Sequence, residues 1–119
     1  MKESNFNDIV KEIISFRDKR NWKQFHKVKD LILGLNIEVG ELQELFLWKT
    51  EKEIELEFGI SKNRTHISHE LSDIFIFLIY LSNHFNIDLL DAVNTKLKIN
   101  NQKYPVHKSK NSAKKYTRL

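Results

Sequence analysis

The sequence predicts an all-α protein built on a four-helix bundle. Apolar residues recur at three- and four-residue steps in four segments, which is the period of an amphipathic helix. The alternating run at residues 51–57 is the one strand-like pattern, and the chain offers it no second strand as a partner. At 119 residues, with 40% hydrophobic and 30% charged residues, the chain has the composition of a single soluble domain, near the size at which self-association aids stability. We therefore expect a bundle that is completed in a homodimer or homotetramer.

The first helix is expected over residues 5–20, with an N-cap at Ser4 or Asn5. The segment that follows breaks the helical pattern and carries Trp22 and His26 between two helices. Aromatic residues in such a connection either close the end of the core or stack on the base of a ligand. The apolar stripe of this helix consists of Phe6, Ile9, Val10, Ile13 and then Phe16 or Arg17.

A second helix is expected over residues 28–49. It contains Gly34 and Gly40, and each glycine costs about 1 kcal/mol relative to alanine inside a helix. The close approach of a neighbouring helix or of a ligand explains such a cost, and the alternative is that the glycines arose by drift without selection. In a continuous helix, Trp48 lies seven residues beyond Glu41 and shares its face, where a base can stack.

The third helix is expected over residues 62–84, after a charged segment at residues 50–64 that forms a short helix or a mobile connection ending near Gly59. Residues 74–81 are eight consecutive apolar residues. A helix that is apolar all round is buried on several sides. We therefore expect the third helix to lie between its own bundle and a second subunit.

The fourth helix is expected to begin after Asp88, which acts as its N-cap, and to end before Pro105. Lys96 and Asn100 lie four residues apart on this helix. A lysine and an asparagine near an acidic cluster can neutralise and orient phosphate oxygens. Alternatively, Lys96 only extends its aliphatic part past the core. The stripe of this helix consists of Leu90, Val93, Leu97, Asn100 and Tyr104.

Two acidic signatures, Glu38-Val-Gly-Glu41 and Glu70-Leu-Ser-Asp73, stand in the second and third helices. Carboxylates three residues apart share one face of a helix. In both signatures the carboxylates lie in or beside the apolar stripe, so four of them point at or along the core. The two stripes consist of Leu31, Leu35, Leu42 and Leu45 in the second helix and of Ile67, Leu71, Ile74, Leu78 and Leu81 in the third.

These carboxylates need a cationic partner. Moving an ionised carboxylate out of water without one costs several kcal/mol, and mutual repulsion within a cluster raises the pKa values. Either signature alone is most often a solvated helix face, but two signatures on apolar faces favour a metal site. Oxygen ligands suit a hard cation, Mg2+ first and Mn2+ as an alternative. His66 and His69 flank Glu70, but no further histidine or cysteine completes a zinc site.

The net charge of +4 is concentrated in the C-terminal tail. Residues 107–119 contain five basic residues and no acidic one, which leaves 15 basic and 16 acidic residues in the rest of the chain. We therefore divide the chain into a helical domain at residues 1–106 and a basic tail at residues 107–119, which we expect to be solvated or disordered. The lack of cysteine, of an apolar signal core and of a long apolar run predicts a cytoplasmic protein without membrane contact.

Four motifs occur in a fixed order: Trp22-x-x-Phe25-His26, then Glu38-Val-Gly-Glu41-Leu-Gln-Glu-Leu-Phe-Leu-Trp48-Lys49, then Glu70-Leu-Ser-Asp73, then Lys96-x-x-x-Asn100-x-x-Lys103-Tyr104-Pro105. Together they resemble the MazG-like all-α nucleotide pyrophosphohydrolases, and most closely the small single-domain branch that includes dCTP pyrophosphatases. The resemblance covers about residues 16–118. The joint match of four motifs in order makes it specific.

The resemblance implies an enzyme that cleaves a nucleoside triphosphate between its α and β phosphates and releases the monophosphate and pyrophosphate. It implies dCTP or a modified pyrimidine deoxynucleotide as substrate, a house-cleaning role, and assembly as a homo-oligomer, typically a dimer of dimers. By this resemblance Mg2+ is held by Glu38, Glu41, Glu70 and Asp73. One of the glutamates orients the attacking water as general base, and Glu41 is preferred to Glu38 for this role. The implied substrate-binding residues are His26, Trp22 and Trp48 at the base and Lys96, Asn100 and Tyr104 at the phosphates.

Three places depart from the family pattern. Ile37 precedes Glu38 where the family often has a second glutamate, and Asn111 stands where a glycine is usual. The stretch after His26 reads Lys27-Val28-Lys29-Asp30 in place of the common proline and asparagine, which bears on base selectivity.

The alternative to an enzyme is a helical binding module that contacts nucleic acid through the basic tail, with the acidic core serving the fold alone. Binding of that kind falls steeply with salt and disappears with the tail. Because the rest of the chain is nearly neutral, we expect nucleic acid to be the less favoured partner.

Overall fold

In a computed structural model that describes residues 5–119, these residues form six α-helices and two short 3-10 helices, and no strand occurs among them. The all-α prediction is therefore confirmed. The chain divides into two compact units. The first unit ends at Phe85, and the second begins at Asn86. The helices are α1 (Phe6–Lys19), α2 (Val28–Glu44), α3 (Glu51–Phe58), α4 (Ser61–His84), α5 (Leu89–Lys103) and α6 (Val106–Ser109), with 3-10 turns at Lys23–Phe25 and Tyr116–Arg118.

Helix α1 follows the predicted bounds closely. Asn5 is its N-cap, because the Asn5 side chain accepts a hydrogen bond of 2.9 Å from the backbone N–H of Asp8. The alternative cap, Ser4, lies outside the described residues. After Lys19 the chain turns through Asn21, whose φ of 53° is in the left-handed region, and enters the 3-10 turn that precedes His26.

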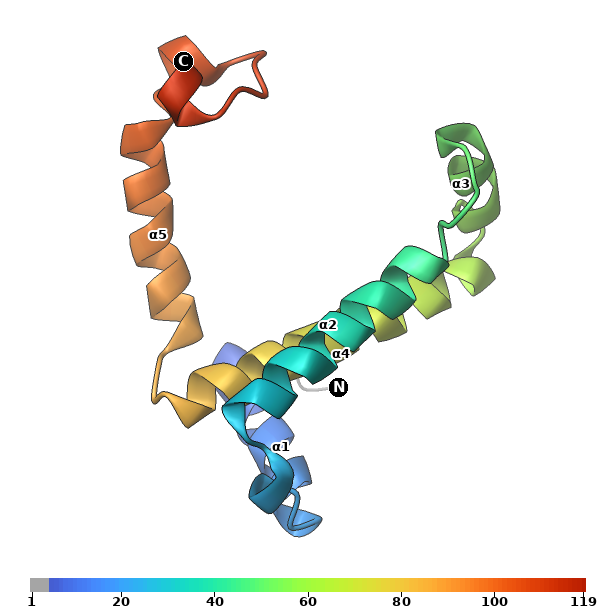
Figure 1. Cartoon of the computed structure of the whole chain (residues 1–119), viewed down its shortest axis with the longest axis vertical. Helices are drawn as coiled ribbons and strands as arrows, with labels where there is room; N and C mark the ends of the chain where they lie inside the picture. The colour runs from blue at the N-terminus through green and yellow to red at the C-terminus, as the bar shows by residue number, and fades with distance from the viewer. Residues whose placement is uncertain (1–4) are drawn as a thin grey trace. The chain divides into compact units, whose positions relative to one another are not determined.

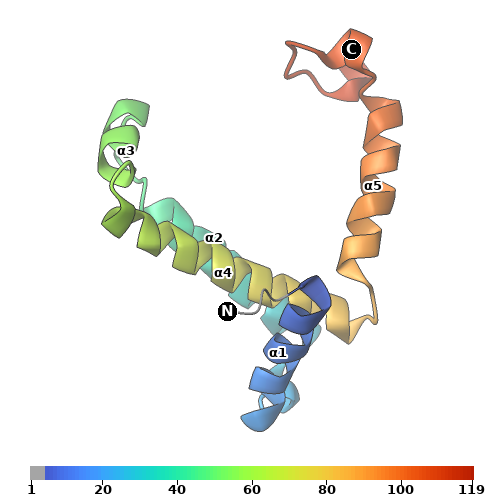
Figure 2. The ribbon, with the colours of Figure 1, turned by 180° about the vertical axis from the view of Figure 1, so that it is seen from behind.

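Helices α2 and α4 lie side by side and run in opposite directions, and together they form the centre of the first unit (Figures 1 and 2). Helix α2 ends at Glu44, five residues before its predicted end. The backbone after Glu44 turns away from the helix. The N–H of Phe46 donates to the carbonyl of Gln43 at 3.0 Å and the N–H of Lys49 donates to that of Phe46 at 3.2 Å, which are turn bonds between residues three apart, and Trp48 has a φ of 65°. Thr50 then caps α3, because its hydroxyl accepts a hydrogen bond of 3.2 Å from the N–H of Glu53.

One of the two glycines in α2 marks a close approach between the helices. A Cβ atom built at Gly34 would come within 2.6 Å of Cζ of Phe77 in α4, far inside van der Waals contact. At Gly40 the same atom would meet nothing within 4 Å. Close approach of a neighbouring helix is therefore confirmed at Gly34, whereas no helix among the described residues approaches Gly40.

Only a few side chains are fully buried among residues 5–85. Leu31 of α2 and Ile79 and Tyr80 of α4 form the apolar centre, and Arg17 is the one charged residue of this range that is buried with them. Much of the apolar run at residues 74–81 keeps partial exposure, Leu78 at 37%. No single helix within residues 5–119 has both the length and the apolarity to cross a bilayer, a level that α4 and α5 reach only when taken as a bent pair.

The second unit begins as predicted. The Asp88 side chain accepts a hydrogen bond of 3.0 Å from the N–H of Asp91 and caps α5, and Pro105 follows the end of the helix. The basic tail is more ordered than expected, because α6 and a final 3-10 turn form within it. The ring of Tyr116 packs edge-on against Tyr104 with centroids 5.8 Å apart. Asn111 adopts a φ of 63°, which asparagine tolerates better than most residues, so its replacement of a glycine is compatible with the turn.

The two glycines of α2 give a matched pair of substitutions. Gly34→Ala is expected to lower the free energy of unfolding by about 1–3 kcal/mol, because the added methyl group has to displace the Phe77 ring. Gly40→Ala is expected to raise the same quantity by up to about 1 kcal/mol, since the methyl group meets open space and alanine favours the helix. Urea unfolding followed by circular dichroism measures both. Equal effects of the two substitutions would contradict the close approach at Gly34.

Candidate active site

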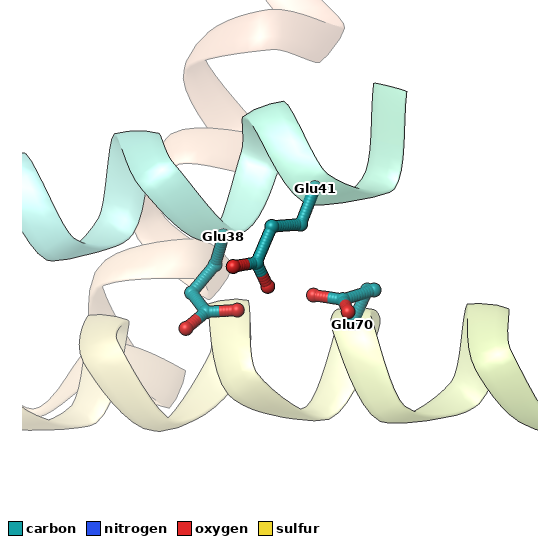
Figure 3. Close-up of side chains that lie close together, drawn as sticks. All are labelled: Glu38, Glu41 and Glu70. Carbon is teal, nitrogen blue, oxygen red and sulfur yellow. The ribbon is translucent and has the colours of Figure 1, made fainter. Parts of the chain in front are cut away.

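Three carboxylates meet between α2 and α4. Glu38 and Glu41 extend from α2 and Glu70 extends from α4, so that their side chains face one another across the two helices (Figure 3). One carboxylate oxygen from each residue lies within 4.8 Å of the other two. The two acidic signatures are therefore brought together as the sequence predicted.

The carboxylates of this cluster lack protein partners. Oε2 of Glu38 and Oε2 of Glu70 are buried and accept no hydrogen bond from the described residues. Burial raises the pKa of Glu38 from 4.5 to about 7, and the nearby carboxyl groups of Glu70 and Glu41 and the negative charge of Asp73 raise it further. When no cation is bound, a proton on Glu38 therefore reduces the repulsion among these carboxylates.

The cluster fits a divalent cation on this evidence. Its donors are carboxylate oxygens only, two of them buried and unpartnered, and they are close enough together to reach one ion. Glu41 is the exposed member of the three, whereas Glu38 and Glu70 are half-buried. Asp73 is outside the group of three, although its charge acts on Glu38.

A large apolar cavity adjoins the acidic residues through Asp73. Its volume is about 790 Å3, enough for a nucleoside. Trp22 and His26, two of the residues that the sequence placed around a base, line it together with Asp73. The remaining lining residues are Ile9, Glu12, Ile13 and Phe16 from α1 and Leu71, Ser72, Phe75, Ile76, Phe77 and Tyr80 from α4.

His26 and Tyr80 form a pair in the wall of this cavity. Their ring centroids are 4.5 Å apart, and Nδ1 of His26 is buried without a hydrogen-bond partner. Burial lowers the pKa of His26, and the positive charge of Arg17 lowers it further. Burial raises the pKa of Tyr80, with Arg17 and Arg20 acting in the opposite direction. Both rings are therefore held in their neutral forms near pH 7.

The structure does not gather every predicted site residue in one place. Trp48 is 91% exposed, has a φ of 65° and does not line the cavity. The expectation that it shares a helix face with Glu41 is wrong, because α2 ends before it. Lys96, Asn100 and Tyr104 belong to the second unit, where Lys96 is exposed and the other two are half-buried.

The sequence carries little signal for a role of Tyr80 or Arg17. Tyr80 stands inside the apolar run of α4, where its hydroxyl group is not distinguished by any pattern. Arg17 left a weak one, since it occupies a place on the apolar stripe of α1 where a charged residue is unusual.

Comparison with known proteins supports the class that fold and site define, an all-α protein with a carboxylate centre beside a nucleoside-sized cavity. The model of the MazG-like family matches residues 33–119. A pyrophosphatase from Archaeoglobus fulgidus, known from its crystal structure, is similar with a TM-score of 0.77 and 30% identity over 88% of this chain and 96% of that one. The chain belongs to the MazG-like family.

Curated relatives narrow the class to an activity. The chain is 43% identical to dCTP pyrophosphatase 1 of Mus musculus and 40% identical to that of Homo sapiens, in each case over 98% of this chain and 69% of the relative. The protein is therefore a nucleotide pyrophosphohydrolase.

The raised pKa of Glu38 makes the stability of the metal-free protein depend on pH. At pH values between about 4.5 and about 7, Glu38 loses its proton in the unfolded chain but keeps it in the folded protein. The free energy of unfolding therefore falls as the pH rises through this range. Glu38→Gln removes the titrating group and leaves a side chain that can donate a hydrogen bond to its neighbours. We expect the variant to be more stable than the wild type at pH 8, by about 1 kcal/mol, and to have no such advantage at pH 4.

Urea unfolding in the presence of a chelator, from pH 4 to pH 8, measures this difference. Glu44→Gln, a change at the end of the same helix outside the cluster, is the matched control. Parallel stability curves for wild type and Glu38→Gln over the whole range would contradict the compensating proton.

Proposed function

We propose that the protein hydrolyses dCTP, or a modified pyrimidine deoxynucleoside triphosphate, between the α and β phosphates in a reaction that depends on Mg2+. The single observation that carries this proposal is the position of Asp73. It belongs to the second acidic signature and also lines the nucleoside-sized cavity, so a site for charge and a site for a base are continuous. The relatives named dCTP pyrophosphatase support the choice of substrate.

Mg2+ is the cation that we propose, with Mn2+ as the alternative. Glu38, Glu41 and Glu70 would hold it, with Asp73 as a fourth ligand. When bound, such a cation neutralises charge on phosphate oxygens and lowers the pKa of water. The buried carboxylates of Glu38 and Glu70 fix its place, because their unpartnered oxygens are not free to turn toward solvent.

Glu41 is the residue that we propose as general base. It is the exposed carboxylate of the cluster, so it can accept a proton from the attacking water and release it to solvent. Glu38 is less suited to this role, because its half-buried carboxyl group holds a proton up to a pH of about 7 in the absence of a cation. Glu38 would instead serve as a ligand that holds the cation with its negative charge.

Trp22 and His26 would enclose the base in the apolar cavity. The Trp22 ring packs edge-on against the Phe16 ring with centroids 5.7 Å apart, and this contact restrains the orientation of the Trp22 ring. His26 lines the same cavity with its pKa lowered by burial, so near pH 7 it would present a neutral ring to the base. Trp48 stays a proposed base contact, and its exposure fits a residue that a ligand or a second copy covers.

Lys96, Asn100 and Tyr104 are the residues that we propose for the phosphates. Lys96 is exposed on α5, and the backbone carbonyl of Asn100 accepts a hydrogen bond of 2.8 Å from the N–H of Tyr104, which ties the end of that helix together. A lysine neutralises phosphate charge as a point cation, whereas an asparagine amide orients one oxygen.

A homodimer or homotetramer is part of the proposal. Ile32, Leu33 and Ile37 of α2 are 45–61% exposed, and Leu90, Val93 and Leu97 form an exposed apolar stripe along α5. Apolar surface of this extent is rare on a monomer and marks a contact with another chain. Burying both faces against copies of the chain would complete the four-helix bundle.

The activity depends on Glu41 in this proposal. Glu41→Gln keeps the size of the side chain and removes its basicity, so the rate of pyrophosphate release from dCTP with Mg2+ is expected to fall by a factor of about 100 or more. The helical circular dichroism is expected to be unchanged, because Glu41 is exposed. Glu44→Gln is again the control. Full activity in Glu41→Gln would eliminate Glu41 as general base.

The base pocket predicts a second result. Trp22→Ala removes one aromatic wall of the cavity, and the loss of base stacking is expected to raise KM for dCTP about tenfold or more. Phe25→Ala is the matched control, since Phe25 is an exposed aromatic residue in the same connection and does not line the cavity. Steady-state kinetics with Mg2+ measures both variants. An equal rise in KM for the two would place the base elsewhere.

A further inference from the structure

The buried arginine of the first unit has no part in the chemistry proposed above. Arg17 is 5% exposed, and it is the one charged residue that is fully buried in the part of the chain that the structure describes. An arginine is kept in such a place only when its N–H donors are satisfied. Its partners therefore indicate what it does.

The guanidinium ties α1 to α4. Nε donates a hydrogen bond of 2.9 Å to Oδ1 of Asp18, and Nη2 forms an ion pair with the same oxygen at 2.9 Å. Nη1 donates a hydrogen bond of 3.2 Å to Oδ1 of Asn83, which is 66 positions away on α4. Every other side-chain hydrogen bond or ion pair found within residues 5–119 joins residues eight or fewer positions apart.

The backbone of the same residue holds the turn that carries Trp22. The carbonyl of Arg17 accepts hydrogen bonds from the N–H of Arg20 at 3.2 Å and from the N–H of Trp22 at 3.1 Å. Asn21 lies in between with a φ of 53°, so the turn has a defined and unusual backbone conformation. A shift of Arg17 would therefore move the tryptophan as well.

The side chain also lies behind the wall of the large cavity. A second, more enclosed cavity of about 240 Å3 shares His26 and Tyr80 with the first, so this pair of rings stands between the two. The charge of the guanidinium acts on both rings. Burial lowers the pKa of His26 and the guanidinium lowers it further, whereas burial raises the pKa of Tyr80 and the guanidinium opposes that rise. The other residues that line the smaller cavity are Arg17, Lys23, Leu31, Asn83 and His84.

We propose that Arg17 is a positioning residue for recognition of the base. Through Asn83 it sets the separation of α1 and α4, and it holds Trp22 and the His26–Tyr80 pair against the bound base. The inference rests on the proposed function, because the cavity between α1 and α4 has to be the base site. Arg17 does not touch the substrate, and the acidic cluster lies on α2 and α4 away from this link. Loss of the link therefore affects discrimination between bases more than turnover.

The test compares two nucleotides that differ in the base alone. dUTP carries a carbonyl group where dCTP carries an amino group. We expect Asn83→Ala and Arg17→Met each to lower the ratio of kcat/KM for dCTP to that for dUTP about tenfold, mainly through KM for dCTP, with kcat within about twofold of the wild type. The double variant is expected to be no worse than either single one, because both changes remove the same link.

Two further variants separate this role from a general structural one. Asn83→Asp keeps an acceptor oxygen for the guanidinium and is expected to retain the wild-type ratio. Lys11→Met removes an exposed positive charge from the same helix and is expected to change nothing. Asn83 is exposed, so its variants are expected to keep the fold. They test the positioning role of Arg17 even if Arg17→Met folds poorly.

Equal losses for dCTP and dUTP, a fall in kcat with KM unchanged, or additive effects in the double variant would each overturn the positioning role. A wild-type protein that releases pyrophosphate from neither nucleotide would instead overturn the proposed function, and the inference with it. The two failures are therefore distinguished by the wild-type assay alone.

Discussion

Repulsion among carboxylates between α2 and α4 is the constraint on which the first unit depends. The same two helices approach closely at Gly34 and Phe77 and place Leu31, Ile79 and Tyr80 in the apolar centre. Further along the pair, Glu38, Glu41 and Glu70 face one another with two buried oxygens unpartnered. Packing at one place thus imposes proximity at the other. A proton on Glu38 offsets this repulsion, and a bound cation would offset it too, so the capacity of the cluster to hold a cation follows from how the helices pack.

The sequence allowed the helices and the acidic cluster to be predicted because both depend on periodicity. Apolar steps of three and four residues located α1, α4 and α5 to within a few residues, and carboxylates on apolar faces located Glu38, Glu41 and Glu70. The end of α2 escaped prediction, because the apolar steps continue through residues 45–49 while the backbone there forms turns, with Trp48 in the left-handed region. Trp48 was misplaced for the same reason, since a helical spacing has no meaning beyond the end of the helix.

Other features depend on contacts between segments far apart in the sequence, which no local pattern records. The link from Arg17 to Asn83 is of this kind, and so is the pairing of His26 with Tyr80. The opposite case is Gly40, where a local signal suggested close packing and the described chain shows open space. A glycine in a helix indicates only that no side chain is needed at that position. The position of the neighbouring helix shows at which glycine a side chain would clash.

The two ends of the proposed site are held by different forces, and this has a consequence for what the protein can select. At the acidic end the carboxylates repel one another, so on this proposal that end would bind any triphosphate that brings a cation. At the other end neutral rings are fixed by packing and by one buried polar link, and these are insensitive to the charge of the ligand. Affinity for the phosphates and choice of the base are therefore separable properties. Asp73, which acts on Glu38 and lines the cavity, is the point at which the two meet.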